Sequence, residues 1–411
     1  MYKRLAALVV VGLLLTALPA QGQDMPWFVY LYSGSARELL RVNADGSQQS
    51  YSLGVDQNTW LSSFDLAFTS DGSRVVFCTV VYPPNSGQGD ARLIVRDVLA
   101  QSNVLQLDLG KAASCRTGQN SLSPDAALVV LTRMNYYPGD PQADTSAPQW
   151  QIQALDLATG NVVQEINANS AGLPEFPISP GMPVIPIVQY VDAQSVIFSP
   201  LPAGSDASIS DSYLWRLDDG SVTSIPGWGN MGVDWLDATG ELIWVDQDET
   251  RPAANPGGPL PSNNVLRLAD KSGEARTIFY SGDWVLVDSD FVNQGQQIAI
   301  QMISNFDMAN PEARQETKWM LLDRAGSLTE VPAVELLFGN IADAPDGYVF
   351  LSAQWQDNDS GIPAYSLKRV SSGVVTDLWS FASDDPSISW ELAWAAPTTP
   401  VNGLQPFLLA Q

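Results

Sequence analysis

The chain repeats one short pattern: an apolar strand, a turn that ends in Gly, and a second strand. In residues 39–53 it reads LLRVNADGSQQSYSL, where apolar and polar positions largely alternate on both sides of Asn-Ala-Asp-Gly. Such alternation predicts half-buried strands, and a Gly turn between two of them predicts a hairpin. Further copies occupy residues 150–166, 213–225, 265–279, 318–331 and 364–378, and a copy that has lost its Gly occupies 92–109.

A second kind of hairpin lies between copies of the first. Each has a short strand, a turn of Asp, Gly, Pro, Asn or Ala, and a β-branched or aromatic strand, as in FDLAFTSDGSRVVFCTV. One hairpin of each kind makes a four-stranded unit of about 45–60 residues, the period of a propeller blade. The sequence therefore predicts an all-β propeller. The second hairpins occupy residues 64–80, 120–134, 188–199, 233–245, 289–302 and 340–353.

The two ends of the pattern are incomplete in a complementary way. With strands named A to D from the centre outward, residues 27–32 form a lone B strand and residues 389–397 a lone A strand. The latter aligns with the strand around Phe68, placing Trp394 on Phe68 and Glu391 on Asp65. We therefore predict seven blades in one domain, 23–411, closed by the C-terminal strand completing the first blade. Six or eight blades stay open, and residues 398–411 are unassigned.

Two segments in particular resemble a known repeat. FTSDGSRVVF (68–77) and LSPDAALVVL (122–131), with LLRVNADGS (39–47), resemble the TolB-type, WD-like propeller repeat. The resemblance implies the propeller fold. It implies no activity, because this architecture serves many functions. The sequence predicts neither the α/β domain nor the hydrolase domain that accompanies the propeller in several relatives, so we do not expect their roles to transfer.

Residues 1–22 have the features of an export signal. Lys3 and Arg4 precede an apolar run of 14 residues, 5–18, which is too short to span a bilayer. Ala20 and Gly22 have the spacing of a cleavage site; cleavage after Gly22 is the first choice and after Ala20 the second. No later stretch predicts a membrane helix. We expect an extracytoplasmic protein, periplasmic or secreted, without membrane insertion after cleavage.

Charge and composition exclude several kinds of partner and of catalytic site. Lys and Arg number 20 against 45 Asp and Glu, a net charge of −25 that disfavours nucleic acid and anionic membranes. The absence of His excludes a Ser-His-Asp triad, an imidazole base and His-ligated metals. The only Cys residues, Cys78 and Cys115, predict a disulfide between a B strand and the following D–A connection. Two buried thiols are the alternative.

The connections predicted on one face are the longer ones. Strand order places B–C and D–A connections on one face and the tight A–B and C–D turns on the other. Function concentrates on loops held by a rigid scaffold, so we expect this face to bind a protein or glycan partner. Exposed Trp60, Trp228, Trp284 and Trp355 could stack on sugars there; burial is the alternative. The long B–C connections are 81–90, 135–149, 200–211, 246–264, 304–316 and 356–363.

Two groups of acids are weaker candidates. Asp357 and Asp359 resemble the start of a calcium loop but lack its later Glu, so a solvated turn is the alternative. Inner-strand acids could ring the channel as a glycosidase pair or a cation site. Alternatively, they only satisfy backbone donors in turns. These acids are Asp65, Asp234, Asp288, Asp290, Asp343 and Glu391.

These observations favour a non-catalytic binding scaffold with no cofactor. A carboxylate-based carbohydrate-active enzyme is the first alternative. A calcium-stabilised structural module is the second.

Overall fold

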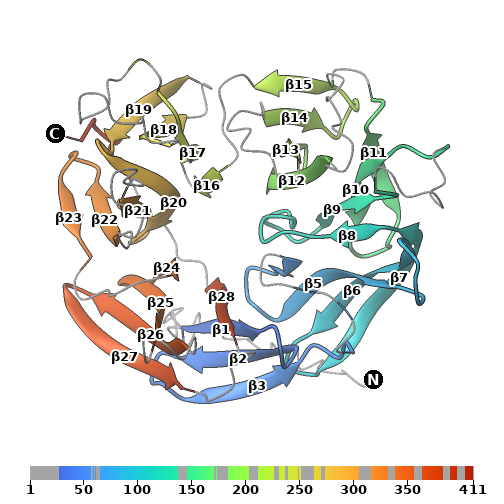
Figure 1. Ribbon diagram of the computed structural model, residues 1–411, viewed down its shortest axis with the longest axis horizontal. Helices are drawn as coiled ribbons and strands as arrows, with labels where there is room; N and C mark the ends of the chain where they lie inside the picture. Colours follow the sequence, from blue (N-terminus) through green and yellow to red (C-terminus); the bar gives the residue numbers. More distant parts are fainter. Residues whose placement is uncertain are drawn as a thin grey trace, which may run out of the picture.

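Seven four-stranded antiparallel sheets form a closed ring in the computed structural model (Figure 1). Within the described ranges there is no helix of the length and hydrophobicity that crossing a bilayer requires. The structure describes residues 27–56, 59, 61, 65–137, 146–170, 173, 184–202, 212–225, 231–236, 239–248, 250, 263–269, 274–304, 316–331, 338–355, 363–382, 389–395 and 403–410.

The strands are given blade by blade, from the centre outward. Blade 1 contains β28 (Trp390–Ala395), β1 (Phe28–Ser33), β2 (Glu38–Asn43) and β3 (Gln48–Ser52). Blade 2 contains β4 (Ala67–Phe68), β5 (Arg74–Val81), β6 (Gly89–Asp97) and β7 (Ser102–Ala112). Blade 3 contains β8 (Ser114–Arg116), β9 (Leu128–Met134), β10 (Trp150–Asp156) and β11 (Val162–Asn167). Blade 4 contains β12 (Val184–Val191), β13 (Ser195–Pro202), β14 (Ser212–Arg216) and β15 (Val222–Ile225).

The remaining three blades have the same order. Blade 5 contains β16 (Met231–Leu236), β17 (Glu241–Asp246), β18 (Val265–Ala269) and β19 (Ala275–Tyr280). Blade 6 contains β20 (Trp284–Val292), β21 (Gln297–Ser304), β22 (Thr317–Asp323) and β23 (Leu328–Glu330). Blade 7 contains β24 (Phe338–Ala344), β25 (Gly347–Trp355), β26 (Pro363–Ser371) and β27 (Val374–Phe381).

The predicted closure is confirmed. β28 pairs antiparallel with β1, with Trp394 opposite Tyr30, so the two ends of the repeat share one sheet. The predicted equivalence of Trp394 and Phe68 is also visible: they occupy the innermost strands of adjacent blades, and their rings lie 5.9 Å apart. β28 thus supplies the innermost strand that the first blade otherwise lacks.

The buried hydrophobic side chains among the described residues form seven clusters, one at each boundary between adjacent blades. Trp215 of blade 4 packs with Trp150 of blade 3, for example. Both faces of a middle strand contact a neighbouring blade, so β5 is buried from Val75 to Val80 without alternation. The outermost strands are mostly exposed, as β7 and β11 show, which explains their weaker sequence pattern.

The turn glycines adopt a backbone conformation with positive φ. Gly160 of blade 3 has φ 72°, and a Cβ there would lie 2.7 Å from the side chain of Leu107 in blade 2. The repeat copy without Gly places Gln101 at the equivalent point with φ 51°, a left-handed conformation that costs a non-Gly residue more.

In the C-terminal tail that the repeat left unassigned, residues 403–410 cross the boundary between blades 5 and 6. Phe407 is fully buried there, and its carbonyl accepts a hydrogen bond of 2.6 Å from Arg276. The Leu408 amide donates to the Arg324 carbonyl, and the Ala410 amide to the Ile278 carbonyl. The tail therefore fastens these two blades together on the side of the tight turns.

Candidate functional site

A cavity of about 640 Å³ lies on the ring axis. Residues at the inner edge of all seven blades line it, which identifies it as the central channel of the propeller. Its wall is uneven in charge. Four aspartates come from β16, β20 and β24, the innermost strands of blades 5, 6 and 7. Blades 1 to 4 contribute aromatic, aliphatic and amide side chains.

Two of these aspartates join neighbouring blades. The Asp234 carboxylate accepts a hydrogen bond of 2.7 Å from the backbone amide of Phe291 in blade 6. The Asp343 carboxylate of blade 7 accepts from the Gln294 amide of blade 6 at 3.0 Å. One role of the inner-strand acids is thus to accept a hydrogen bond from a backbone amide across a blade boundary. The sequence analysis gave such backbone hydrogen bonding as the alternative to a glycosidase pair or a cation site.

Asp288 and Asp290 differ from these two. Burial raises the pKa of the Asp290 carboxyl well above its usual range, and the negative charges of Asp288 and Asp234 raise it further. Burial likewise raises the pKa of Asp288, which accepts a hydrogen bond from the adjacent Ser289 amide. The register of β20 shifts between Leu286 and Asp288, and such bulges redirect side chains near sites.

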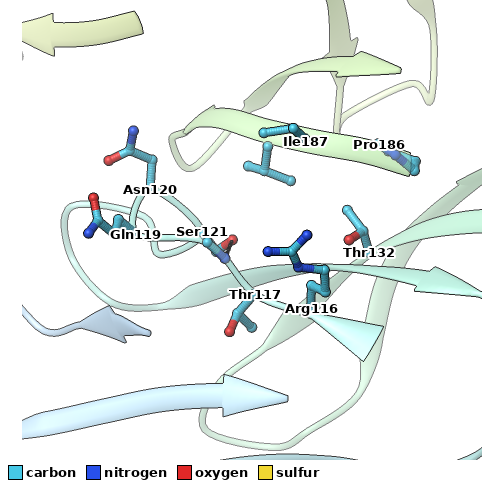
Figure 2. Close-up of a pocket in the computed structure, with 10 residues that line it drawn as sticks. Arg116, Thr117, Gln119, Asn120, Ser121, Thr132, Pro186 and Ile187 are labelled. Carbon is cyan, nitrogen blue, oxygen red and sulfur yellow. Dashed lines mark hydrogen bonds between the residues drawn. The ribbon is translucent and has the colours of Figure 1, made fainter. Parts of the chain in front are cut away.

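A second cavity, of about 320 Å³, lies between blades 3 and 4 (Figure 2). Arg116, Thr117 and Thr132 line its blade 3 side, and Pro186 and Ile187 of β12 its blade 4 side. Figure 2 shows the guanidinium of Arg116 directed between these two sides. The pocket shares Gln119, Asn120, Ile187 and Val188 with the central cavity, so it is a side pocket of the channel.

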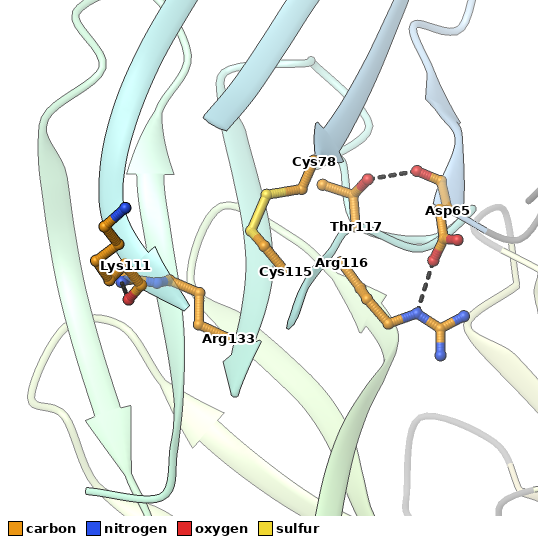
Figure 3. Close-up of a disulfide and its surroundings, with 7 residues drawn as sticks. All are labelled: Asp65, Cys78, Lys111, Cys115, Arg116, Thr117 and Arg133. Carbon is orange, nitrogen blue, oxygen red and sulfur yellow. Dashed lines mark hydrogen bonds and ion pairs between the residues drawn. A yellow bond between two sulfur atoms is a disulfide. The ribbon is translucent and has the colours of Figure 1, made fainter. Parts of the chain in front are cut away.

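Three consecutive residues tie the Arg116 segment to blade 2 (Figure 3). Cys115 forms a disulfide with Cys78 of β5, with Cα atoms 5.6 Å apart. The Arg116 Nε donates a hydrogen bond of 2.7 Å to the Asp65 carboxylate, and the Thr117 hydroxyl donates to the Asp65 carbonyl. The structure places Cys115 within β8, the innermost strand of its blade, and not in the connection that the sequence predicted.

Chain direction shows which face the side pocket approaches. β12 enters from the D–A side at Val184, and Pro186 is near that end. Thr132 lies opposite Arg116, close to the end of β9 from which the B–C connection leaves. The pocket is therefore nearer to the face with the long B–C connections than to the face with the tight turns.

Most of the other predicted site residues fall outside the described residues. This holds for Trp60, Trp228, Asp357 and Asp359, and for the side chain of Trp355, whose backbone ends β25. Trp284 is described: it begins β20, is half-buried, and has the Lys318 Nζ 3.9 Å from its ring centroid. Sugar stacking and calcium binding at these positions therefore stay predictions. No group of three or more acidic, Cys or His side chains among the described residues is arranged to hold a metal ion.

Arg116 was missed by the sequence reasoning, which searched for acids and aromatic residues. A usable signal was present, because Arg116 directly follows a Cys predicted to lie near the face with the long B–C connections. An arginine beside a disulfide is held by a short, rigid backbone. The innermost strand of blade 3 also breaks after Arg116 and pairs again only through a single bridge, Leu122 to Val129, and the loop between them forms part of the pocket.

Comparison with known proteins gives the fold alone. No known family profile and no curated protein sequence matches the chain. Among solved structures, an acylaminoacyl peptidase of Pyrococcus horikoshii is similar with a TM-score of 0.51 and 11% identity, over 87% of this chain and 53% of that one. The chain thus spans about half the length of that peptidase.

Two further propellers are similar at lower scores. The β-propeller domain of the trilobed protease of Pyrococcus furiosus has a TM-score of 0.49 and 12% identity, over 84% of this chain and 88% of that one. A putative TolB of Agrobacterium tumefaciens has 0.39 and 10%, over 89% and 97%. The closed ring of seven four-stranded sheets defines the class of the protein as a seven-bladed β-propeller. The resemblance to the TolB-type repeat holds at the level of the fold.

Proposed function

We propose that this protein is an extracytoplasmic, non-catalytic binding scaffold whose protein or glycan partner docks on the face that carries the B–C connections. The observation that carries the proposal is the difference between the two faces. On the tight face, β26 ends at Ser371 and β27 begins at Val374; on the other, β17 ends at Asp246 and β18 begins at Val265. A rigid ring with elaborated loops on one face is typical of a binding scaffold.

The side pocket supports the same face, because it lies toward the B–C end of β9. Ligand sites favour such concave places with a mostly apolar wall and a few convergent polar groups.

Site-specific photocrosslinking tests the proposal in the native host. A photoreactive residue replaces Asn85, which is exposed in the B–C connection of blade 2, or Ala158, which is exposed in a tight turn of blade 3. We expect one defined crosslinked partner from position 85 and none from position 158. Equal crosslinking from both positions, or none from either, would contradict docking on the B–C face.

Carbohydrate hydrolysis is a second candidate function, favoured by the electrostatic coupling of Asp290 to Asp288 and Asp234. An acid that keeps its proton beside an ionised carboxylate is the arrangement that glycosidases use. The test is release of reducing sugar from a glycan panel. Activity that disappears in Asp290→Asn would support this candidate, and absence of activity in the wild-type protein would remove it.

Calcium stabilisation through Asp357 and Asp359 is the remaining proposal. Its test is thermal melting with and without a chelator, in which an unchanged Tm contradicts a calcium site.

A further inference from the structure

The C-terminal tail, residues 403–410, occupies a surface that blades 5 and 6 form without it. Both blades have four paired strands of their own, and the tail belongs to neither sheet. Figure 1 shows the C-terminal end of the chain beside β19, and the tail also contacts the tight turns that follow β20 and β22. We call this surface the tail site; it consists of Arg276 and Ile278 of β19, Gly295, Arg324 and Gly326.

The tail site binds the backbone of an extended segment. The Leu408 amide donates a hydrogen bond of 3.0 Å to the Arg324 carbonyl, and the Ala410 amide donates one of 2.8 Å to the Ile278 carbonyl. Ile278 is the extra residue at a register shift of β19 and has no partner in β18. Main-chain hydrogen bonds from every second residue are typical of a peptide that binds along a strand.

One side chain anchors the tail. Phe407 is fully buried, with its ring centroid 6.2 Å from that of Phe291 and 4.2 Å from the Arg324 Cζ. The two following side chains point away from the site, since Leu408 is 59% and Leu409 49% exposed. A single buried aromatic residue between weakly held neighbours is the usual arrangement of a peptide anchor. The tail site therefore selects for Phe at one position of the segment.

Contacts within the propeller hold the tail site in shape. The Arg324 Nε donates 2.8 Å to the Gly295 carbonyl, and its Nη2 lies 2.8 Å from the Glu241 carboxylate. These partners belong to blades 5 and 6, so the guanidinium is fixed independently of the ring that it covers. Gly326 allows the tail backbone to approach, because a Cβ there would lie 2.7 Å from the Leu409 carbonyl oxygen. A site that is already ordered loses little entropy when a segment binds.

We propose that the tail is exchangeable, so that the tail site binds residues 403–410 of a second copy of this chain as well as the chain's own. The anchor and the hydrogen bonds above are the same whichever copy supplies the segment. The chain's own tail has the higher effective concentration and keeps the protein monomeric until that tail is weakened. Two copies that exchange tails form a closed dimer. The tail site lies on the side of the tight turns, so this proposal is separate from docking on the B–C face.

The probe is a peptide of residues 403–410, GLQPFLLA, blocked at both ends and titrated into the whole chain by calorimetry. Phe407→Ala weakens the chain's own tail and leaves the tail site unchanged, so we expect this variant to bind the peptide. The wild-type protein should bind it at least about tenfold more weakly, because its own tail competes at high effective concentration. Phe407→Leu should give the same order with a smaller difference, and it serves if Phe407→Ala does not fold.

Two altered peptides identify the anchor. The peptide with Ala in place of Phe407 should bind the Phe407→Ala protein at least about tenfold more weakly, since truncating a buried aromatic anchor removes most of the binding energy. The peptide with Ala in place of Leu408 is the matched control and should bind as tightly as the parent, because that side chain is exposed.

Mixing two whole-chain variants measures exchange between copies. Phe407→Ala offers an intact tail site, and Arg276→Gln offers an intact tail held less firmly, because it lacks the donor to the Phe407 carbonyl. We expect light scattering to detect a complex of two chains in the mixture and monomers in each variant alone. Arg92→Gln replaces Arg276→Gln in the control mixture and should give monomers, since Arg92 pairs with Asp108 on the exterior of blade 2.

The proposal would be overturned if neither Phe407 variant bound the peptide, or if the wild-type protein bound it as tightly as they do. Equal binding of the parent peptide and the peptide without Phe, or the absence of a two-chain complex in the mixture, would also overturn it. The photocrosslinking at Asn85 reports on the other face, so this proposal and the proposed function can fail separately.

Discussion

At two blade boundaries, an aspartate at the inner edge of one blade contacts the next blade, but the charges around the two aspartates are opposite. Between blades 2 and 3, Asp65 meets Arg116, and a disulfide lies beside the pair. Between blades 5 and 6, Asp234 meets a backbone amide, and the nearby charges are two more carboxylates, Asp288 and Asp290. Both acids lie in the innermost strand of a blade or just before it, but the first boundary yields a wall that carries a cation and the second an acidic channel wall.

The difference shows how aspartates at the inner edges of one ring acquire separate roles. An aspartate with an arginine partner is compensated and becomes a structural anchor that orients the guanidinium. At boundary 5/6, burial and the negative charges of Asp288 and Asp234 disfavour the charged state of Asp290, so Asp290 retains its proton to higher pH. Boundary 5/6 gains rigidity elsewhere, from the buried Phe407 and from the Arg324–Glu241 pair at 2.8 Å.

Removing the disulfide should have the largest effect. Cys78→Ala/Cys115→Ala opens a loop of sequence separation 37, and loop-closure entropy predicts a loss of about 4 kcal/mol in the free energy of unfolding. Denaturant unfolding measures it. Wild-type protein under reducing conditions is the control and should lose a similar amount. A loss below about 1 kcal/mol would show that the cross-link adds little to this boundary.

Phe407→Ala tests the corresponding fastening at the other boundary. Emptying a fully buried aromatic site should cost about 3 kcal/mol, because the ring contacts both blades. Leu408→Ala is the matched control in the same tail; this side chain is 59% exposed and should change stability by less than about 0.5 kcal/mol. Equal effects from the two variants would mean that the tail is not packed as described.

Asp65→Asn should cost about 2 kcal/mol, between the values for buried and exposed ion pairs, since Arg116 is one-third exposed. Asp108→Asn breaks the exposed pair with Arg92 and should cost less than about 0.5 kcal/mol. Urea unfolding at two salt concentrations separates them: the Asp108 effect should vanish at high salt, and most of the Asp65 effect should stay. A salt-sensitive Asp65 effect would argue against a buried anchor.

Asp290→Asn should have the smallest effect on stability, and it should stabilise the protein where the other variants destabilise it. The pKa of Asp290 is raised in the folded state, so its stabilising proton is fully bound below about pH 4 and is lost as the pH rises through the raised pKa. At pH 7 the variant should therefore melt higher than the wild-type protein, on the order of 2 °C.

The same comparison at pH 3.5 supplies the control for Asp290, since the two proteins should then melt together. Asp377→Asn, at a side chain that is 77% exposed, should show no such pH dependence. A lower Tm for Asp290→Asn at pH 7 would place a stabilising partner on this carboxylate.

The sequence predicted the ring because its cause is local and repeated. Each hairpin carries its own alternation and turn residue, and the unmatched strands 27–32 and 389–397 could complete only each other. The pairing of Cys78 with Cys115 followed from their being the only two. The pocket could not be predicted in this way, because it arises where the pattern fails, in the broken inner strand after Arg116. The buried tail around Phe407 is similar: it belongs to no repeat, and its partners Arg276 and Arg324 are distant in sequence.

The central claim is that the inner edge of boundary 2/3 is fixed by the Asp65–Arg116 pair beside the disulfide, and the most direct test is the Nε–H NMR signal of Arg116. We predict that its proton exchanges with water more slowly than that of the exposed Arg92, and that Asp65→Asn removes this protection. Exchange as fast as that of Arg92 would contradict the account.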